Sequence, residues 1–229
     1  MNLILRTHVK SFMMSKQVVT ILLIMFFVFN DGRAYSQGEF LREQKVRGRY
    51  YAERDKCRDL IKGRNWKKAE IVCRAALSTA KQFGNDGNDR DLVISRAHQL
   101  FGYVMMAQSR YREALDHYQR ALDVVRARLT EEDGELGQLY GDIAAAHRAL
   151  RDLDKAREFY RKSEKSYRLA IADIDDERFE QQYRISLKKI FELHLLAAEQ
   201  SGASSEVEEI KKALESLTPT GGVLLNTTP

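Results

Sequence analysis

The residue types that most often perform chemistry are present in this chain, but their spacing forms no recognisable site. Four histidines lie in the central region, at His98, His117, His147 and His194. They show no H-x-x-x-H or comparable metal-ligand spacing. The acidic loop around Asp86 lacks the glycine and terminal glutamate of a calcium-binding EF-hand. A glycine-rich phosphate loop and a nucleophile elbow are missing as well. We therefore expect no catalytic residues, no metal and no cofactor.

One group of side chains does have a spacing that suits ligand binding. Arg54, Arg58 and Lys62 lie four residues apart, which places three cations on one side of a helix. Guanidinium groups form charge-assisted hydrogen bonds with carboxylates, so the stripe suits an acidic or C-terminal carboxylate ligand. The alternative is a solvated charged face whose arginines pair within the helix with residues such as Glu53 and Asp59.

Helices must position these side chains, because the chain has the composition and the turn signals of an all-α protein. Apolar residues make up 44% and charged residues 31% of the sequence, a composition that can bury a core. Both prolines, Pro219 and Pro229, lie near the C-terminal end, so long helices are expected before them. Helical apolar spacing between polar turns predicts four antiparallel helix hairpins. The predicted helices are 39–62, 66–82, 90–108, 111–129, 132–150, 153–173, 177–200 and 205–217.

A short signature returns three times at a nearly constant interval. Its copies begin at Trp66, Tyr111 and Leu153, and an alanine follows each of them three residues later. The intervals between the copies are 45 and 42 residues. Periods of this size indicate stacked helical units that cannot bury their apolar faces alone.

Together with Phe101-Gly102 and Ile143-Ala144 in the preceding helices, the signature makes the chain resemble the tetratricopeptide repeat family. The resemblance covers most of residues 50–170 and is strongest in 93–167. The intervals exceed the usual ~34 residues and look like those of kinesin light chains. The resemblance implies an all-α, right-handed α-solenoid of about four antiparallel helix hairpins, with a degenerate last hairpin as its cap. A helical repeat of another family or an irregular bundle is the structural alternative.

Solenoids of this kind bind partners in a groove along the inner face of the first helix in each hairpin. Alignment of the copies assigns to this groove Tyr51, Arg54, Arg58, Ile61, Lys62, Arg96, Gln99, Tyr103, Met106, Gln138, Ala145, Arg148 and Ala149. The resemblance thus implies a non-catalytic scaffold that binds a protein or peptide, and the cationic stripe favours an acidic one. It does not support the carboxylate clamp of some tetratricopeptide cochaperones, because Arg58 and Tyr103 stand where that clamp has asparagine.

Cys57 and Cys73 are the only cysteines, and they fall on the two helices of the first predicted hairpin. Facing helices in an oxidising compartment allow a disulfide between them. The predicted hairpin places them about one turn out of register, however, and a disulfide needs Cα atoms within about 7 Å. Two buried reduced thiols are therefore the favoured interpretation, with the disulfide as the alternative.

The N-terminal segment has the pattern of a targeting signal. Basic residues that include Lys16 precede the apolar run 18–29, and small residues follow it near Ala34 and Ser36. Residues 1–36 therefore predict a signal peptide and an extracytoplasmic protein, either periplasmic or secreted. The alternative is an uncleaved anchor, favoured by the basic residues of 42–49. In that case the protein would be a membrane-tethered adaptor or assembly factor, and only then would the membrane be a partner.

Setting the predicted signal peptide aside changes the charge balance. The whole chain has 38 Lys and Arg residues against 33 Asp and Glu, and residues 37–229 have 34 against 32. Such a small excess argues against nucleic acid as a partner. The predicted organisation is a repeat domain over 37–217, followed by a flexible tail over 218–229 that contains Gly221 and Gly222.

Overall fold

The computed structural model of the protein describes residues 37–83, 88–126, 129–130 and 133–217. The predicted signal peptide and the predicted tail lie outside these residues. Within them the structure has eight helices and no strands. They are α2 (Gln37–Lys62), α3 (Trp66–Ala80), α4 (Asn88–Ala107), α5 (Tyr111–Val125), α6 (Gly134–Ala149), α7 (Leu153–Asp173), α8 (Glu177–Ser201) and α9 (Ser204–Leu217). Among the described helices, none is long and apolar enough to cross a membrane.

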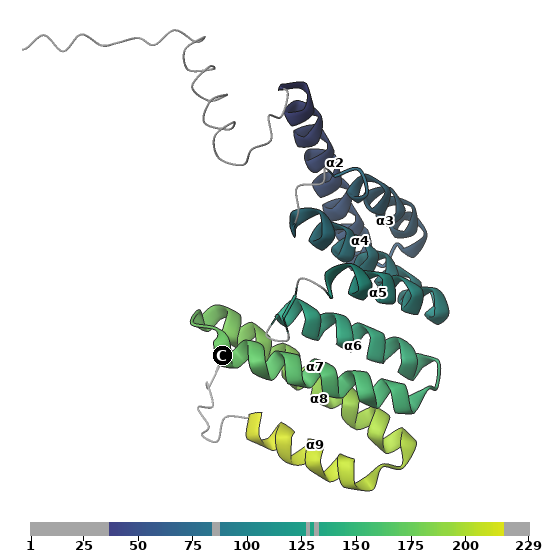
Figure 1. Cartoon of the computed structure of the whole chain (residues 1–229). Helices are drawn as coiled ribbons and strands as arrows, with labels where there is room; N and C mark the ends of the chain where they lie inside the picture. Colours follow the sequence, from purple (N-terminus) through teal and green to yellow (C-terminus); the bar gives the residue numbers. More distant parts are fainter. Residues whose placement is uncertain (1–36, 84–87, 127–128, 131–132, 218–229) are drawn as a thin grey trace, which may run out of the picture. The chain divides into compact units, whose positions relative to one another are not determined.

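The helices pack against one another in chain order. From Val46 onwards the residues form one compact unit, and the packing described here lies within it. Each of the helices α3 to α8 contacts the next helix in the chain, and α6 also contacts α4 and α8 (Figure 1). Helix α2 joins the array through a hydrogen bond of 3.3 Å from the Tyr50 hydroxyl to the Val93 carbonyl of α4. The predicted all-α array of helix hairpins is confirmed.

The turns inside the hairpins share one backbone design. A residue with positive φ follows the first helix in each case, at Arg64 (54°), Ser109 (61°), Arg151 (64°) and Gly202 (74°). The next residue then donates its backbone N–H to a carbonyl five residues earlier, as Asn65 does to Leu60 and Asp152 to His147. This is the closure expected when a left-handed residue ends a helix. The second helices consequently begin at Trp66, Tyr111 and Leu153, where the repeated signature predicts them.

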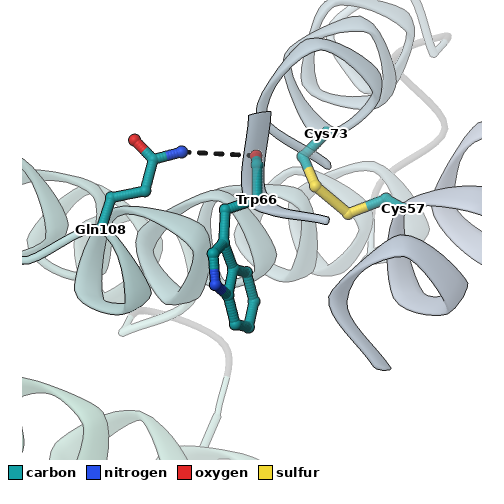
Figure 2. Close-up of a disulfide and its surroundings, with 4 residues drawn as sticks. All are labelled: Cys57, Trp66, Cys73 and Gln108. Carbon is teal, nitrogen blue, oxygen red and sulfur yellow. Dashed lines mark hydrogen bonds between the residues drawn. A yellow bond between two sulfur atoms is a disulfide. The ribbon is translucent and has the colours of Figure 1, made fainter. Parts of the chain in front are cut away.

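A disulfide joins Cys57 of α2 to Cys73 of α3, with a Cα–Cα distance of 5.3 Å (Figure 2). Both residues are buried. The expectation that they lie a turn out of register, as two reduced thiols, is therefore wrong. Cys57 stands eight residues before Asn65 and Cys73 eight residues after it. In an antiparallel hairpin, positions equally distant from the turn come level with one another, which brings the two sulfur atoms together.

The following hairpins fill the same crossing with other side chains. Gly102 and Tyr118 lie eight residues on either side of Arg110, and a Cβ at Gly102 would come within 2.6 Å of the Tyr118 ring. Glycine is therefore required where this buried ring meets α4. In the third hairpin, Ala144 and Tyr160 lie eight residues on either side of Asp152, and both are buried. Small residues thus set the close approach of the paired helices.

Candidate functional site

The candidate site is the exposed side of the first helices of the hairpins, α2, α4, α6 and α8, which we call the first-helix face. On α2, the Arg54 guanidinium lies 4.8 Å from the centre of the Tyr51 ring and pairs with Asp55 at 2.7 Å. Arg58 and Lys62 are exposed, and neither forms an ion pair with any residue in the described part of the chain. Two of the three predicted cations of this stripe are thus without a carboxylate partner.

The alternative of intrahelical pairing applies to one member of the stripe only. Arg54 has a partner on its own helix, but it is Asp55 rather than either of the predicted carboxylates. Glu53 instead pairs with Arg49 at 2.9 Å and accepts a 2.7 Å hydrogen bond from the Thr79 hydroxyl. Because Glu53 serves the contact between α2 and α3, it is not available to neutralise the stripe.

The cations of α2 and α4 gather around one buried tyrosine. Burial raises the pKa of Tyr50 to about 12, and the positive charges of Arg54, Arg96 and Arg58 oppose that rise. The nearby Tyr51 side chain also raises the pKa of Arg96 on α4. Three of the predicted groove cations therefore act on the pKa of this one tyrosine.

On α4, two predicted groove residues contact α6. Arg96 forms an ion pair with Glu135, and this hydrogen bond raises the pKa of Arg96 further against the effect of its partial burial. Gln99 Nε2 donates a 2.7 Å hydrogen bond to Asp142 Oδ2. Both residues thus connect neighbouring first helices. Tyr103 is 49% exposed, whereas Met106 packs against the core.

Arg148 lies apart from this group, at the C-terminal end of α6. Its Nε is enclosed and has no hydrogen-bond partner among the described residues. Burial raises the pKa of Tyr160, and the nearby guanidinium of Arg148 opposes this rise. No hydrogen bond or ion pair between described residues joins Arg148 to the cations of α2. The structure therefore gives Arg148 a different environment from the rest of the predicted groove.

The sequence interpretation missed several residues of the first-helix face. Glu135 and Asp142 lie on α6, and Asp142 follows the predicted groove residue Gln138 by four residues, so helical spacing alone could have included it. Ile185 and Leu196 of α8 are 56% and 45% exposed, and their spacing of eleven residues places them on one side of the helix. They were missed because the last hairpin is too degenerate to align with the others.

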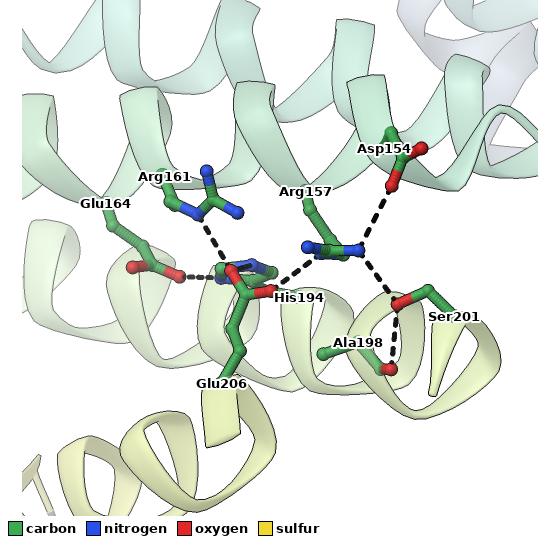
Figure 3. Close-up of polar contacts among 8 residues, drawn as sticks. All are labelled: Asp154, Arg157, Arg161, Glu164, His194, Ala198, Ser201 and Glu206. Atoms are coloured by element: carbon green, nitrogen blue, oxygen red, sulfur yellow. Dashed lines mark hydrogen bonds and ion pairs between the residues drawn. The ribbon is translucent and has the colours of Figure 1, made fainter. Parts of the chain in front are cut away.

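The histidines form contacts that their spacing did not predict. His98 and His117 approach to 2.9 Å between their Nδ1 atoms. His194 is buried between two carboxylates, with Nδ1 at 2.5 Å from Glu164 and Nε2 at 3.0 Å from Glu206 (Figure 3). The described residues contain no group of three or more His, Cys, Asp or Glu side chains arranged to hold a metal ion.

The contacts around His194 connect the last three helices. Glu206 of α9 accepts hydrogen bonds from Arg157 at 2.6 Å and Arg161 at 2.7 Å, both from α7 (Figure 3). Burial raises the pKa of Glu206, but the hydrogen bond from Arg161, the charge of His194 and the hydrogen bond from Arg157 together hold it below its usual range. Each of these side chains has a polar partner, and a fully satisfied network of this kind makes the packing of the helices rigid.

Comparison with known proteins agrees with the repeat interpretation. The sequence model of the tetratricopeptide repeat family matches residues 93–168. Among solved structures, BtubC (BKLC) from P. vanneervenii is similar over 82% of this chain and 95% of its own, with 14% identity and a TM-score of 0.42. A putative kinesin light chain from Podosopora anserina with nearly identical TPR-like repeats is similar over 76% of this chain and 94% of its own, with 10% identity and a TM-score of 0.45. No curated protein sequence matches the chain.

Proposed function

We propose that this chain binds a protein or peptide along its first-helix face, because residues 93–168 match the tetratricopeptide repeat model, and repeats of this kind serve as scaffolds for protein interactions. The proposed role is non-catalytic. It consists of holding a partner, and through it a larger assembly, against helices that are fixed by the hairpin turns and the core.

The observation that carries this proposal is the unpaired positive charge on α2. Arg58 and Lys62 are exposed and have no carboxylate partner in the described helices, while Arg54 and Arg96 already have one. An acidic segment of a partner would supply carboxylates to Arg58 and Lys62, and it could place an apolar group against the exposed Tyr51 ring. Arginine and tyrosine are the residue types that most often dominate binding energy at protein interfaces.

We further propose that the protein acts outside the cytoplasm. The Cys57–Cys73 disulfide supports this location, because disulfides persist mainly in oxidising compartments. The signal-peptide pattern of residues 1–36 supports it independently. In the alternative, the apolar run 18–29 is retained as an anchor and the scaffold is tethered to the membrane. The mass of the purified protein and its distribution between soluble and membrane fractions separate the two.

The test is affinity capture with the full chain, expressed in its own host and immobilised through the C-terminus. The wild type is compared with the double variant Arg58→Glu plus Lys62→Glu. We expect the wild type to retain at least one partner. The double variant should retain at least tenfold less of it, because two attractive charges become repulsive.

A matched control carries the same change of charge elsewhere. Lys67→Glu plus Arg112→Glu alters two exposed cations of the second helices α3 and α5, so it should leave capture unchanged. If both double variants lose the partner equally, binding depends on net charge and the first-helix face is not the site. If the wild type retains no protein, the scaffold proposal itself is overturned.

A further inference from the structure

Asp142 is a partly buried carboxylate on the first-helix face that has no cation beside it. Its Oδ2 atom accepts the 2.7 Å hydrogen bond from Gln99. No Lys, Arg or His nitrogen of the described residues lies within the 4.0 Å of an ion pair. The second oxygen, Oδ1, has no hydrogen-bond partner in the described part of the chain, and it is not enclosed by protein atoms.

Four other partly buried carboxylates in the array each have a basic partner. Glu53, Glu70, Glu164 and Glu206 have side chains that are 14% to 21% exposed, and each has an Arg or His nitrogen within 3.0 Å. This pairing is the usual condition for a carboxylate withdrawn from water, because an unpaired buried charge is costly. Asp142 departs from that pattern.

The electrostatics agree with the geometry. Burial raises the pKa of Asp142 to about 6, against the hydrogen bond from Gln99 and the charge of Lys189 on α8. Lys189 is exposed and lies beyond ion-pair distance, so it compensates the carboxylate only in part. At neutral pH the group remains ionised, and a cation placed against Oδ1 would relieve the cost of its burial.

The side chains near Asp142 suit a long cationic side chain. Ala145 follows by three residues on the same side of α6, and its side chain is short. On α4, the exposed Tyr103 follows Gln99 by four residues. An exposed aromatic ring can accommodate the alkyl stem and the charged end of an arginine.

We propose that Asp142 is a recognition residue for an arginine or lysine side chain of the partner. That the ligand is a protein rests on the proposed function. That it presents a cation rests on the geometry of Asp142 on α6 and Gln99 on α4. The partner would therefore present its cation to α6 and its acidic group to α2.

The test follows the Asp142 carboxylate directly, by carbon-13 NMR titration of the full chain. The probe is N-acetylarginine amide, and the comparison is N-acetylcitrulline amide, which has the same shape without the charge. We expect the arginine derivative, at about 50 mM and constant ionic strength, to lower the titration midpoint of Asp142 by about one pH unit or more. The citrulline derivative should leave it unchanged, and Asp142→Asn should remove the signal and so assign it.

Asp123 provides the matched control. Its carboxylate accepts a 2.9 Å hydrogen bond from Gln119, as Asp142 does from Gln99, but it is exposed on α5. An equal response of Asp123 would show general ion pairing and overturn the proposal. A midpoint of Asp142 that does not move would overturn it as well.

The two proposals fail in distinguishable ways. If capture depends on Arg58 and Lys62 but the arginine derivative does not affect Asp142, the scaffold stands and the recognition role of Asp142 falls. If Asp142 responds and no protein is captured, the cation site stands without a protein ligand. Where a partner is captured, Asp142→Asn should weaken its binding about tenfold or more, and Asp123→Asn should not.

Discussion

At the scale of single residues, burial decides the chemistry of the histidines more than their spacing does. The Nδ1 atoms of His98 and His117 are 2.9 Å apart, so one ring donates and the other accepts a hydrogen bond. Two protonated rings could not make this contact. Burial, followed by the charge of His117, lowers the pKa of His98 to about 4. The pair is therefore neutral and structural in the folded protein at neutral pH.

This pair gives the protein a defined sensitivity to acid. In the unfolded chain the pKa of His98 is near 6.5, so as the pH falls the unfolded state binds the proton first. The contribution of the neutral ring to stability is complete above pH 6.5 and is lost as the pH falls through 4. We expect the wild type to lose about 3 kcal/mol more than His98→Gln between pH 7 and pH 4. Urea unfolding at a series of pH values measures the difference, and parallel profiles would contradict it.

The sequence predicted positions that depend on spacing within a single helix. Arg54, Arg58 and Lys62 form a stripe because of spacing within α2, and the structure has that stripe. The partners of Arg96 and Gln99 could not be predicted in the same way. Which residues of α6 lie opposite α4 depends on the register between two helices, and that register is set by packing over the whole hairpin.

At the scale of elements, the conformation of the hairpin turns fixes where each second helix begins. All four place a residue in the left-handed region of φ, yet only one of them uses glycine, at Gly202. Arginine and serine occupy this position in the other turns, although the conformation costs a residue with a Cβ about 1–2 kcal/mol. The packing of the hairpins must therefore compensate for strain at Arg64, Ser109 and Arg151.

Two glycine substitutions separate this conformational effect from crowding. A Cβ would meet no atom within 4 Å at either Gly202 or Gly48. We expect Gly202→Ala to lower the free energy of unfolding by about 1 kcal/mol, because its φ of 74° disfavours a side chain. Gly48 lies inside α2, so Gly48→Ala should raise the stability by up to about 1 kcal/mol. Thermal unfolding compares the two variants. A gain in both would show that residue 202 does not hold the left-handed conformation.

Helix positions were largely predictable, and the ends that differ have local reasons. The predicted helix 111–129 ends at Val125, and the predicted helix 132–150 begins at Gly134. Between them, the Thr130 N–H bonds to the Asp133 carboxylate at 3.3 Å and not to a helical carbonyl. The apolar periodicity of the sequence continues through this region, so it did not predict that the Asp133 side chain would take the place of a helical acceptor. Side chains such as aspartate offer the backbone an alternative to the helix that periodicity does not register.

At the scale of the whole molecule, the first and last hairpins of the described array are held by different means. The first has the disulfide between α2 and α3. The last has the ionic network in which His194 and Glu206 connect α7, α8 and α9 (Figure 3). Between them, the hairpins depend on the packing of small residues against aromatic rings, as at Gly102 and Tyr118.

The contribution of the disulfide can be measured without altering the other hairpins. It closes a loop of 16 residues, for which the loss of chain entropy in the unfolded state predicts about 3 kcal/mol of stabilisation. We expect Cys57→Ser plus Cys73→Ser to lower the free energy of unfolding by about 2–4 kcal/mol in urea. Dithiothreitol should destabilise the wild type and leave the double variant unaffected. An identical response of both proteins would show that the two thiols are not linked.

The disulfide also shows that one hairpin geometry can be built from unrelated side chains. In the first two hairpins, the residues eight positions before and after the turn residue meet, although their side chains differ. A disulfide takes this position in the first hairpin, and a glycine against a tyrosine takes it in the second. The family model matches residues 93–168 and does not reach the first hairpin. The first two hairpins thus share one geometry at the crossing and fill it with different side chains.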